Sequence, residues 1–350
     1  MTLGAAVTGL SFTFILGVRG ADVLQKVLPP NERNKNENWV GKTGSWRAHM
    51  NVLQRFVFPP SSFVIAKYGG GAGELTFVLR IVQENITSAL IMEDDADWDV
   101  RLKTQAQSVA LASQAYLQPL RSDRSQTLSS LYAHPPSPDD NPAIDLHSVP
   151  ATLPPECPYG DDWDVLWLGH IGSRLPTEST PFPPPPTFLT LSTPDASVPA
   201  PHHLKRHPFA SKPDPLASDF PPHTRVVHAS RGTAGIQAYA VSQRGARRLL
   251  HRFGLEEFSA SYDLMLRDWC DGSGGEEGAD ERPVCVVTQP PIFSQWYSSG
   301  GSDIHGIGGG YFRGTGSTYV RRSVMVNMAR LVAGREELVD QWPDDGQGPW

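Results

Sequence analysis

The chain has 350 residues, of which 39% are hydrophobic and 19% charged, enough for one large α/β domain or two small ones. Its formal net charge of −7 excludes nonspecific nucleic-acid binding, which requires basic patches. The three cysteines, Cys157, Cys270 and Cys285, lack paired metal-ligand spacing but permit one disulfide, so the redox compartment stays open.

The N-terminal residues are apolar and uncharged. Residues 3–10 predict a helix end and residues 11–18 a strand. A signal peptide or membrane anchor would place a basic residue before the apolar run, whereas the first base here, Arg19, follows it. Membrane association is left open, and so is localisation, between the secretory pathway and the cytoplasm.

The next segment predicts a second helix and then a break. Apolar residues recur at helical spacing within residues 46–57. Proline pairs and a glycine run predict a loop at residues 58–73. A further helix is expected at residues 75–84, followed by a buried strand.

That strand, residues 89–92, is apolar and runs directly into a cluster of carboxylates: Glu93, Asp94, Asp95, Asp97 and Asp99. Open α/β sheets place ligand chemistry at the carboxyl ends of their strands. In extended chain, Glu93, Asp95 and Asp97 would project to one face, and carboxylate oxygens are ligands that Mg²⁺ and Mn²⁺ prefer. The sequence therefore predicts a divalent cation bound to a sugar-nucleotide diphosphate here. The alternative is a solvated loop whose aspartates cap the next helix.

A second acidic patch precedes the predicted strand at residues 165–168. Because its acids, Asp161, Asp162 and Asp164, enter the strand rather than leave it, a loop or capping role is favoured. His170 lies at the exit of this strand, where it can reach a ligand, although a lone histidine is more often structural.

The second half of the chain alternates proline-rich stretches with short elements. Residues 122–158 and 176–222 are rich in proline, serine and aspartate, which predicts long disordered insertions. The expected elements are strands at 235–241 and 285–287, a helix at 243–253 capped by Ser242, helices at 262–269 and 320–339, and an acidic tail at 341–350.

Asp263 begins the predicted helix at residues 262–269 beside apolar neighbours. One hypothesis makes it a general base that takes a proton from an acceptor hydroxyl. The alternative is a carboxylate stabilised by the helix dipole. The chain contains neither a G-x-S-x-G nor an H-E-x-x-H motif, which disfavours the common hydrolases.

Several segments, in order, resemble glycosyltransferase family 25, the group of lipooligosaccharide and collagen galactosyltransferases, and particularly its fungal branch. They include GKTGSWRAHMNVLQR, SALIMEDDADWDVR, YGDDWDVLWLGH, YAVSQRGARRLL, DLMLRDWCDG and SDI. The resemblance implies a GT-A-like, nucleotide-sugar-binding α/β fold. It also implies a single domain over residues 1–340, interrupted by an insertion at residues 56–80.

The resemblance further implies inverting, Mn²⁺-dependent (or Mg²⁺-dependent) transfer of a hexose, commonly galactose, from a UDP-sugar to a hydroxyl of a glycan or glycoprotein. Carried over to this sequence, Glu93, Asp95 and Asp97 are expected to hold the metal. Asp94, Asp95 and His170 are expected to hold the UDP-hexose, and Asp263 is the expected base.

Two alternatives to an active glycosyltransferase remain. Relative to the family pattern, the chain starts beyond an opening strand and a nucleotide-holding segment, and it carries Ser294, Gln295 and Trp296 where the fungal pattern has a histidine pair. These differences favour an inactive or truncated family member that keeps the fold as a binding module. A third, weaker hypothesis is a hydrolase that uses the same acids and metal.

Overall fold

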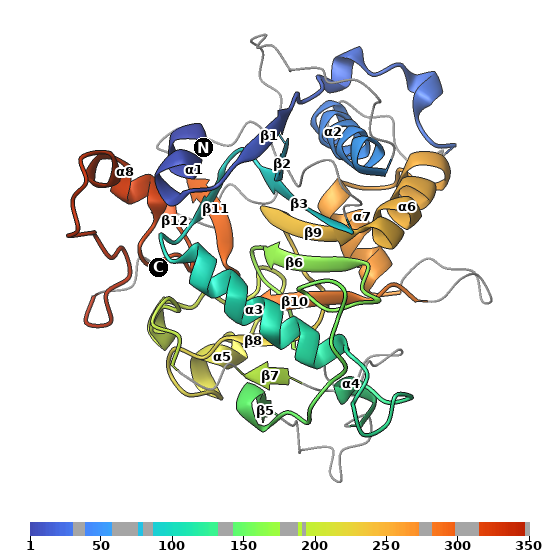
Figure 1. The fold of residues 1–350 in the computed structure, drawn as a ribbon. Coiled ribbons are helices and arrows are strands. Elements are labelled where there is room, and N and C mark those ends of the chain that lie inside the picture. Colours follow the sequence, from blue (N-terminus) through green and yellow to red (C-terminus); the bar gives the residue numbers. More distant parts are fainter. Residues whose placement is uncertain are drawn as a thin grey trace.

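The protein has a mixed α/β architecture built on one mixed β-sheet (Figure 1). The computed structural model describes residues 1–30, 39–57, 76–79, 87–131, 143–175, 188–190, 194–272, 282–297 and 315–346. Among these residues, no helix is both long enough and apolar enough to cross a bilayer.

The order of strands in the sheet brings distant parts of the chain together. Along the sheet lie β1 (Phe12–Ile15), β2 (Thr76–Leu79), β3 (Ser88–Glu93), β9 (Ala238–Ser242), β6 (Val165–Gly169), β10 (Cys285–Gln289), β8 (Val226–Ala229), β7 (Phe188–Thr190) and β5 (Ala143–Asp145). Strand β9 is antiparallel to both β3 and β6, and β10 is parallel to β6. Therefore β3, β6 and β10 all point the same way, and their carboxyl ends share one edge.

A smaller group of strands lies beyond this edge. It consists of β4 (Ala96–Trp98), β11 (Phe293–Tyr297) and β12 (Gly316–Ser317). Strand β11 pairs antiparallel with both β4 and β12, and its first residue, Phe293, also pairs with Gly169 at the end of β6. The group is thus joined to the main sheet where β6 ends.

Helices cover both faces of the sheet. One face packs against α2 (Trp39–Val57), α6 (Gln243–His251) and α7 (Tyr262–Cys270), and the other against α3 (Leu102–Leu117). The short helices are α4 (Leu128–Leu131) and α5 (Pro215–Ser218), the 3₁₀ turns η1 (Gly20–Asp22), η2 (Gln25–Val27), η3 (Leu146–Ser148) and η4 (Pro201–His203), and the π-turn η5 (Arg252–Glu256).

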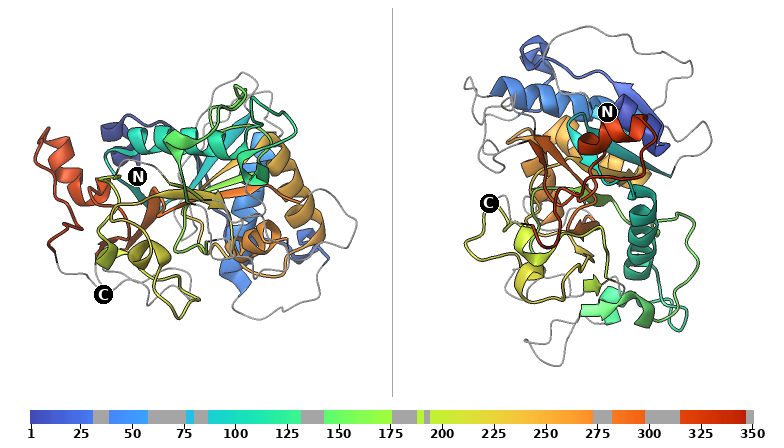
Figure 2. Two further views of the ribbon diagram at one scale, coloured as in Figure 1. Left: turned by 90° about the horizontal axis from the view of Figure 1, so that it is seen from below. Right: turned by 90° about the vertical axis from the view of Figure 1, so that its left-hand side faces the viewer.

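The two ends of the described chain meet beside β4. Helix α1 (Thr2–Thr8) lies next to α8 (Val324–Val332) in both views of Figure 2. A Cβ at Gly4 would come within 3.0 Å of Val324, so glycine allows this close approach. The predicted helix and strand within residues 1–18 are therefore confirmed, and both pack into the protein.

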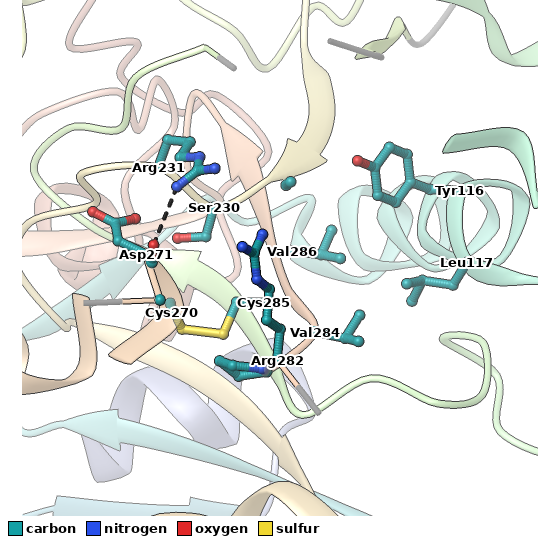
Figure 3. Close-up of a pocket in the computed structure, with 13 residues that line it drawn as sticks. Tyr116, Leu117, Ser230, Arg231, Cys270, Asp271, Arg282, Val284, Cys285 and Val286 are labelled. Carbon is teal, nitrogen blue, oxygen red and sulfur yellow. Dashed lines mark hydrogen bonds between the residues drawn. A yellow bond between two sulfur atoms is a disulfide. The ribbon is translucent and has the colours of Figure 1, made fainter. Parts of the chain in front are cut away.

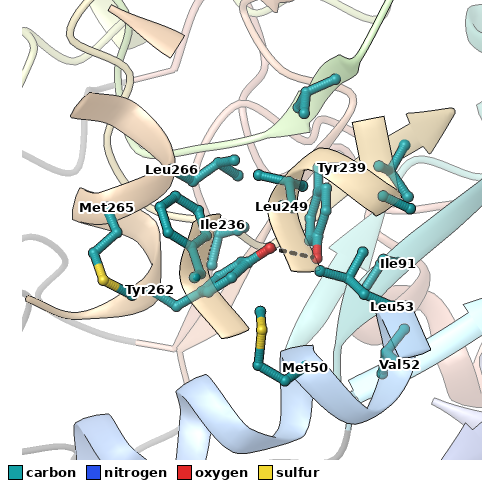
Figure 4. Close-up of a cluster of buried hydrophobic side chains, with 14 of the residues drawn as sticks. Met50, Val52, Leu53, Ile91, Ile236, Tyr239, Leu249, Tyr262, Met265 and Leu266 are labelled. Atoms are coloured by element: carbon teal, nitrogen blue, oxygen red, sulfur yellow. Dashed lines mark hydrogen bonds between the residues drawn. The ribbon is translucent and has the colours of Figure 1, made fainter. Parts of the chain in front are cut away.

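Alternation along the strands assigns each side chain to a face. Ile91, Trp167 and Tyr239 pack in the cluster under α2, α6 and α7 (Figure 4). Met92 and Leu166 pack in the cluster under α3. Because Glu93 is two residues beyond Ile91, it belongs to the α2 and α7 face.

Most of the predicted elements are confirmed. Helices α2, α6 and α7 and strands β3, β6, β9 and β10 form where they were expected, although α2 begins earlier, at Trp39. Ser242 caps α6 as predicted, because its Oγ accepts from the backbone N–H of Gly245 at 3.0 Å.

Other expectations were wrong. Of the helix predicted at residues 75–84, the described residues Thr76–Leu79 form instead the strand β2, which pairs with β1 and β3 although it lies within the predicted insertion at 56–80. The loop predicted at residues 58–73 falls outside the described residues. The closing helix, α8, is shorter than predicted, because Ser323 caps its start.

The described part of the second proline-rich segment is more ordered than composition predicted. Its residues 194–222 pack against the body of the protein, with Val198 and Leu216 buried. Asp195 in this segment pairs with the buried Arg225 at 2.7 Å. The tail also packs, because Trp342 is buried and its indole N–H donates to the backbone oxygen of Ser317. Because these buried side chains are widely spaced along the chain, they form no periodic pattern that the sequence could reveal.

One disulfide, Cys270–Cys285, joins the end of α7 to the start of β10. Of the pairings that the composition left open, this is the one observed, while Cys157 is a free, buried thiol. The bridge ties a helix on one face directly to the sheet.

Replacing both Cys270 and Cys285 with alanine is expected to lower the free energy of unfolding by about 3 kcal/mol, because the bridge closes an interval of 15 residues. Urea denaturation without reductant measures this loss. Dithiothreitol should bring the wild-type protein to the stability of the double variant and leave the variant unchanged. A wild-type protein indifferent to reductant would contradict the assignment.

Candidate functional site

The acidic stretch forms a turn between β3 and β4 that β11 holds in place. Strand β3 ends at Glu93, and Asp94 and Asp95 make the turn, all three partly exposed. The backbone oxygen of Asp95 accepts from the N–H of Trp296 at 2.7 Å, and its Oδ2 accepts from Nε2 of Gln295 at 2.9 Å. A segment about two hundred residues away thus sets the geometry of this turn.

This turn lies at the edge of the sheet shared by the carboxyl ends of β3, β6 and β10. The backbone N–H of Glu93 donates to the carbonyl of Gln237, the residue before β9, at 3.0 Å. At the end of β6, a Cβ on Gly169 would lie 2.7 Å from the nitrogen of Ala238 and 2.9 Å from Cβ of Phe293. Only glycine allows β6, β9 and β11 to converge so closely here.

Glu93 faces a buried polar cluster between the sheet, α2 and α7. The Tyr239 hydroxyl lies 3.2 Å from the Tyr262 hydroxyl (Figure 4). It also lies 3.2 Å from His49 Nδ1, and the His49 ring stacks on Tyr262 with a centroid distance of 4.0 Å. Burial chiefly, and then the neighbouring Tyr262 and Glu93, raise the pKa of Tyr239. Asp263, half-buried in the first turn of α7, directly follows Tyr262.

Asp97 takes a different place from Glu93 and Asp95. Its carboxylate is fully buried and accepts from the Ser317 and Ser323 hydroxyls at 2.6 and 2.5 Å. The backbone N–H groups of Trp98 and Met325 also donate to it, at 2.9 and 3.2 Å. Burial raises its pKa, and these hydrogen bonds oppose that shift.

Asp97 lies apart from Glu93 and Asp95 because of the local backbone geometry. The predicted projection of Glu93, Asp95 and Asp97 to one face assumed continuous extended chain, but the turn at Asp94 and Asp95 interrupts it. Asp97 therefore connects β4 to β12 and α8. Within the described part of the chain, no group of three or more His, Cys, Asp and Glu side chains is arranged to hold a metal ion.

His170 lies at the expected edge of the sheet, but its side chain is buried. Its Nε2–H donates to the backbone oxygen of Thr288 at 2.9 Å. Burial lowers its pKa to about 3, so the ring is neutral. Among the described residues, neither His170 Nδ1 nor the Oε1 of the adjacent, buried Gln237 has a hydrogen-bond partner.

The patch that precedes β6 has the structural role that was favoured for it. The buried carboxylate of Asp164 pairs with Arg244 at 3.0 Å and with Arg248 at 2.8 Å. It also accepts from the backbone N–H of Val284 at 2.8 Å, and Asp161 accepts from the backbone N–H of Cys157 at 3.0 Å. These acids hold the entrance of β6.

The contributions of Tyr239 and Tyr262 were missed at the sequence level, because both looked like ordinary core aromatics. Their side chains meet only through tertiary packing between β9 and α7. The available signal was that both, like His49, fall within or beside the segments that resemble the glycosyltransferase family.

No protein-family model, no curated protein and no solved structure matches this chain. The candidate site therefore rests on its own residues. It combines partly exposed carboxylates on a braced turn, a buried tyrosine–histidine cluster behind Glu93, and a neutral histidine at the exit of β6.

Replacing Asp97 with alanine is expected to lower the free energy of unfolding by about 3 kcal/mol or more, because two buried hydroxyls and two backbone N–H groups lose their acceptor. The exposed Asp145, whose side chain accepts from the N–H of His147, is the matched control. Its alanine variant should lose about 1 kcal/mol or less. Equal losses in urea denaturation would show that Asp97 does not have this role.

Four histidines make stability depend on pH. Burial lowers the pKa of His49 and His170 to about 3, that of His228 to about 4, and also that of His207. Between about pH 4.5 and 6.5 the unfolded chain binds protons on the rings of His49, His170 and His228 and the folded chain does not, so these three rings make stability rise with pH. Three carboxyl groups oppose this, because burial raises the pKa of Asp214 to about 6 and also raises the pKa of Asp97 and Asp271.

His49, His170 and His228 should therefore each add to the free energy of unfolding as the pH rises from about 4.5 to about 6.5, by up to about 1.4 kcal/mol per pH unit. Urea denaturation across this range measures the slope. His49→Gln should flatten it, while the same change at the exposed His147 should not. Equal slopes for the wild-type protein and His49→Gln would contradict the expectation.

Proposed function

We propose that the protein is a metal-dependent glycosyltransferase of GT-A-like architecture that moves a hexose from a UDP-sugar to an acceptor hydroxyl, with inversion. The observation that carries the proposal is the acidic turn from Glu93 to Asp95 at the carboxyl edge of the sheet, the edge where open α/β sheets bind ligands. The family resemblance suggests galactose as the sugar and a glycan or glycoprotein as the acceptor.

The donor set of the turn suits a hard cation. Mg²⁺ and Mn²⁺ bind carboxylate oxygens, and commonly take one or two carboxylates together with substrate phosphates and water. Glu93 and Asp95, both partly exposed, would hold the ion, without a contribution from the sequestered Asp97. When bound, the cation would offset the charge that develops on the leaving UDP.

The surroundings of the turn support its fixed geometry. Gln295 and Trp296 of β11 bind the side chain and backbone of Asp95, so the carboxylate is positioned before any ligand arrives. Burial chiefly, and then the charge of the nearby Asp95, raise the pKa of the Tyr297 hydroxyl. Tyr297 thus stays protonated and can donate to a ligand oxygen.

Asp263 is the proposed base. It lies half-buried in the first turn of α7. The adjacent Tyr262 anchors this turn through Tyr239, which pairs in the sheet with Ile91, two residues before Glu93. Asp263 would accept the proton of the acceptor hydroxyl as that oxygen attacks the sugar.

A second function uses the same residues without turnover. Four protein donors engage Asp97, so of the three predicted metal ligands it is committed to the fold, and a module that binds UDP and transfers nothing is the second candidate. Transfer and simple binding are separated by the following experiment.

Asp95→Asn should reduce Mn²⁺-dependent transfer from UDP-galactose by about a hundredfold or more, because changes outside the metal's direct ligands already cost up to about that much. Asp162→Asn is the matched control, since the Asp162 side chain is 87% exposed. Product chromatography with and without Mn²⁺ measures transfer.

Equal activity of the wild-type protein and Asp95→Asn would end the assignment. Calorimetric UDP binding by a wild-type protein that shows no turnover would identify the binding module. Free hexose as the main product, instead of a glycosylated acceptor, would identify a hydrolase.

A further inference from the structure

A pocket of about 290 Å³ lies at the opposite edge of the sheet from the acidic turn. It opens between the end of α3, the end of β8 and the start of β10, whereas the acidic turn lies where β10 ends. Its walls include Tyr116, Arg231, Asp271, Arg282, Val284 and Val286 (Figure 3). This pocket is separate from the candidate glycosyltransferase site.

The polar side of the pocket is predominantly cationic. Its charged lining residues are Arg231, Arg282 and Asp271, two positive and one negative. Arg231 is 9% exposed and donates through Nη1 to the backbone oxygen of Asp271 at 3.3 Å, while the Asp271 carboxylate accepts from the N–H of Gly232 at 3.1 Å. The guanidinium of Arg231 is thus fixed by the backbone, within the wall.

The guanidinium groups of Arg231 and Arg282 line the same pocket, close enough for their charges to interact. Burial chiefly lowers the pKa of Arg231, and the nearby charge of Arg282 lowers it further while Asp271 opposes the shift. Figure 3 shows Arg231, Arg282 and the Tyr116 hydroxyl directed toward the middle of the pocket from three different elements. Burial raises the pKa of Tyr116 to about 12, so its hydroxyl remains neutral.

The other side of the pocket is apolar and rigid. Val284 and Val286 form part of this wall together with Leu117. The disulfide Cys270–Cys285 also lines the pocket and fixes the segment next to Asp271 to the start of β10. The disulfide therefore fixes the cationic side of the pocket in position relative to the apolar side.

We propose that this pocket binds a small organic anion whose phosphate or carboxylate group lies between Arg231 and Arg282. The planar guanidinium fork matches both kinds of anion in a bidentate arrangement. The body of the ligand, an apolar or aromatic ring, lies against Val284 and Val286 beside the neutral Tyr116 hydroxyl. The volume matches the lower end of small-molecule sites, which suits a ligand of one ring.

Isothermal titration calorimetry of the full chain with phenyl phosphate, benzoate and phenol tests the proposal. Saturable binding of phenyl phosphate or benzoate at one site is expected, and the tighter of the two identifies the anionic group. Phenol should bind at least about tenfold more weakly, because it lacks the charge that the guanidinium groups recognise. Phenol binding as tightly as either anion, or no saturable binding of either, would overturn the proposal.

Variants locate the site. Arg282→Gln should weaken binding of the better anion by about tenfold or more, and because Arg282 is exposed the variant should fold. Arg231→Gln should do the same if it folds. The exposed Arg335, after α8, is the matched control, and Arg335→Gln should bind like the wild-type protein. Unchanged affinity in Arg282→Gln would place the anion elsewhere and refute the proposal.

Discussion

The antiparallel pairing of β9 between β3 and β6 is the constraint on which the rest of the structure depends. Met92 and Gly169 both pair with Ala238, so the ends of two strands far apart in the chain are held at one level. The hydrogen bond from Glu93 to the carbonyl of Gln237 extends this pairing to the first residue of the acidic stretch. Moving β9 by one residue would reverse the faces of all its side chains and separate Tyr239 from His49 and Tyr262.

The acidic stretch divides into two parts with opposite surroundings. Up to Asp95 the carboxylates are partly exposed, and after it Asp97 and Asp99 are buried. Asp97 is satisfied by hydroxyl and backbone donors, and Asp99 by Arg101 at 2.7 Å and the N–H of Arg322 at 2.9 Å. A buried carboxylate is tolerable only with such partners, so the second part fixes the C-terminal segments against β4, whereas the first lies partly exposed at the edge of the sheet.

Local patterns predicted the elements whose signals are local. The apolar run before Glu93, the periodicity of α2 and the Ser242 cap each depend on neighbouring residues, and each was confirmed. The strand β2 could not be recognised, because it exists through backbone pairing with β1 and β3. The same limit applies to the site. The strand end was predictable, but the sequestration of Asp97 depends on Ser317 and Ser323, more than two hundred residues away.

The bracing of the acidic turn by β11 also has a consequence for biosynthesis. Gln295 lies 200 positions after Asp95, and Ser323 lies 226 positions after Asp97. During synthesis, which proceeds from the N-terminus, β3 emerges long before the residues that close its turn. The acidic turn therefore lacks its contacts with β11 until the large loop between these two segments closes. Segments that are synthesised about two hundred residues later thus complete this edge of the sheet, so a chain that stops before β11 would lack the brace of the acidic turn even if its central strands had paired.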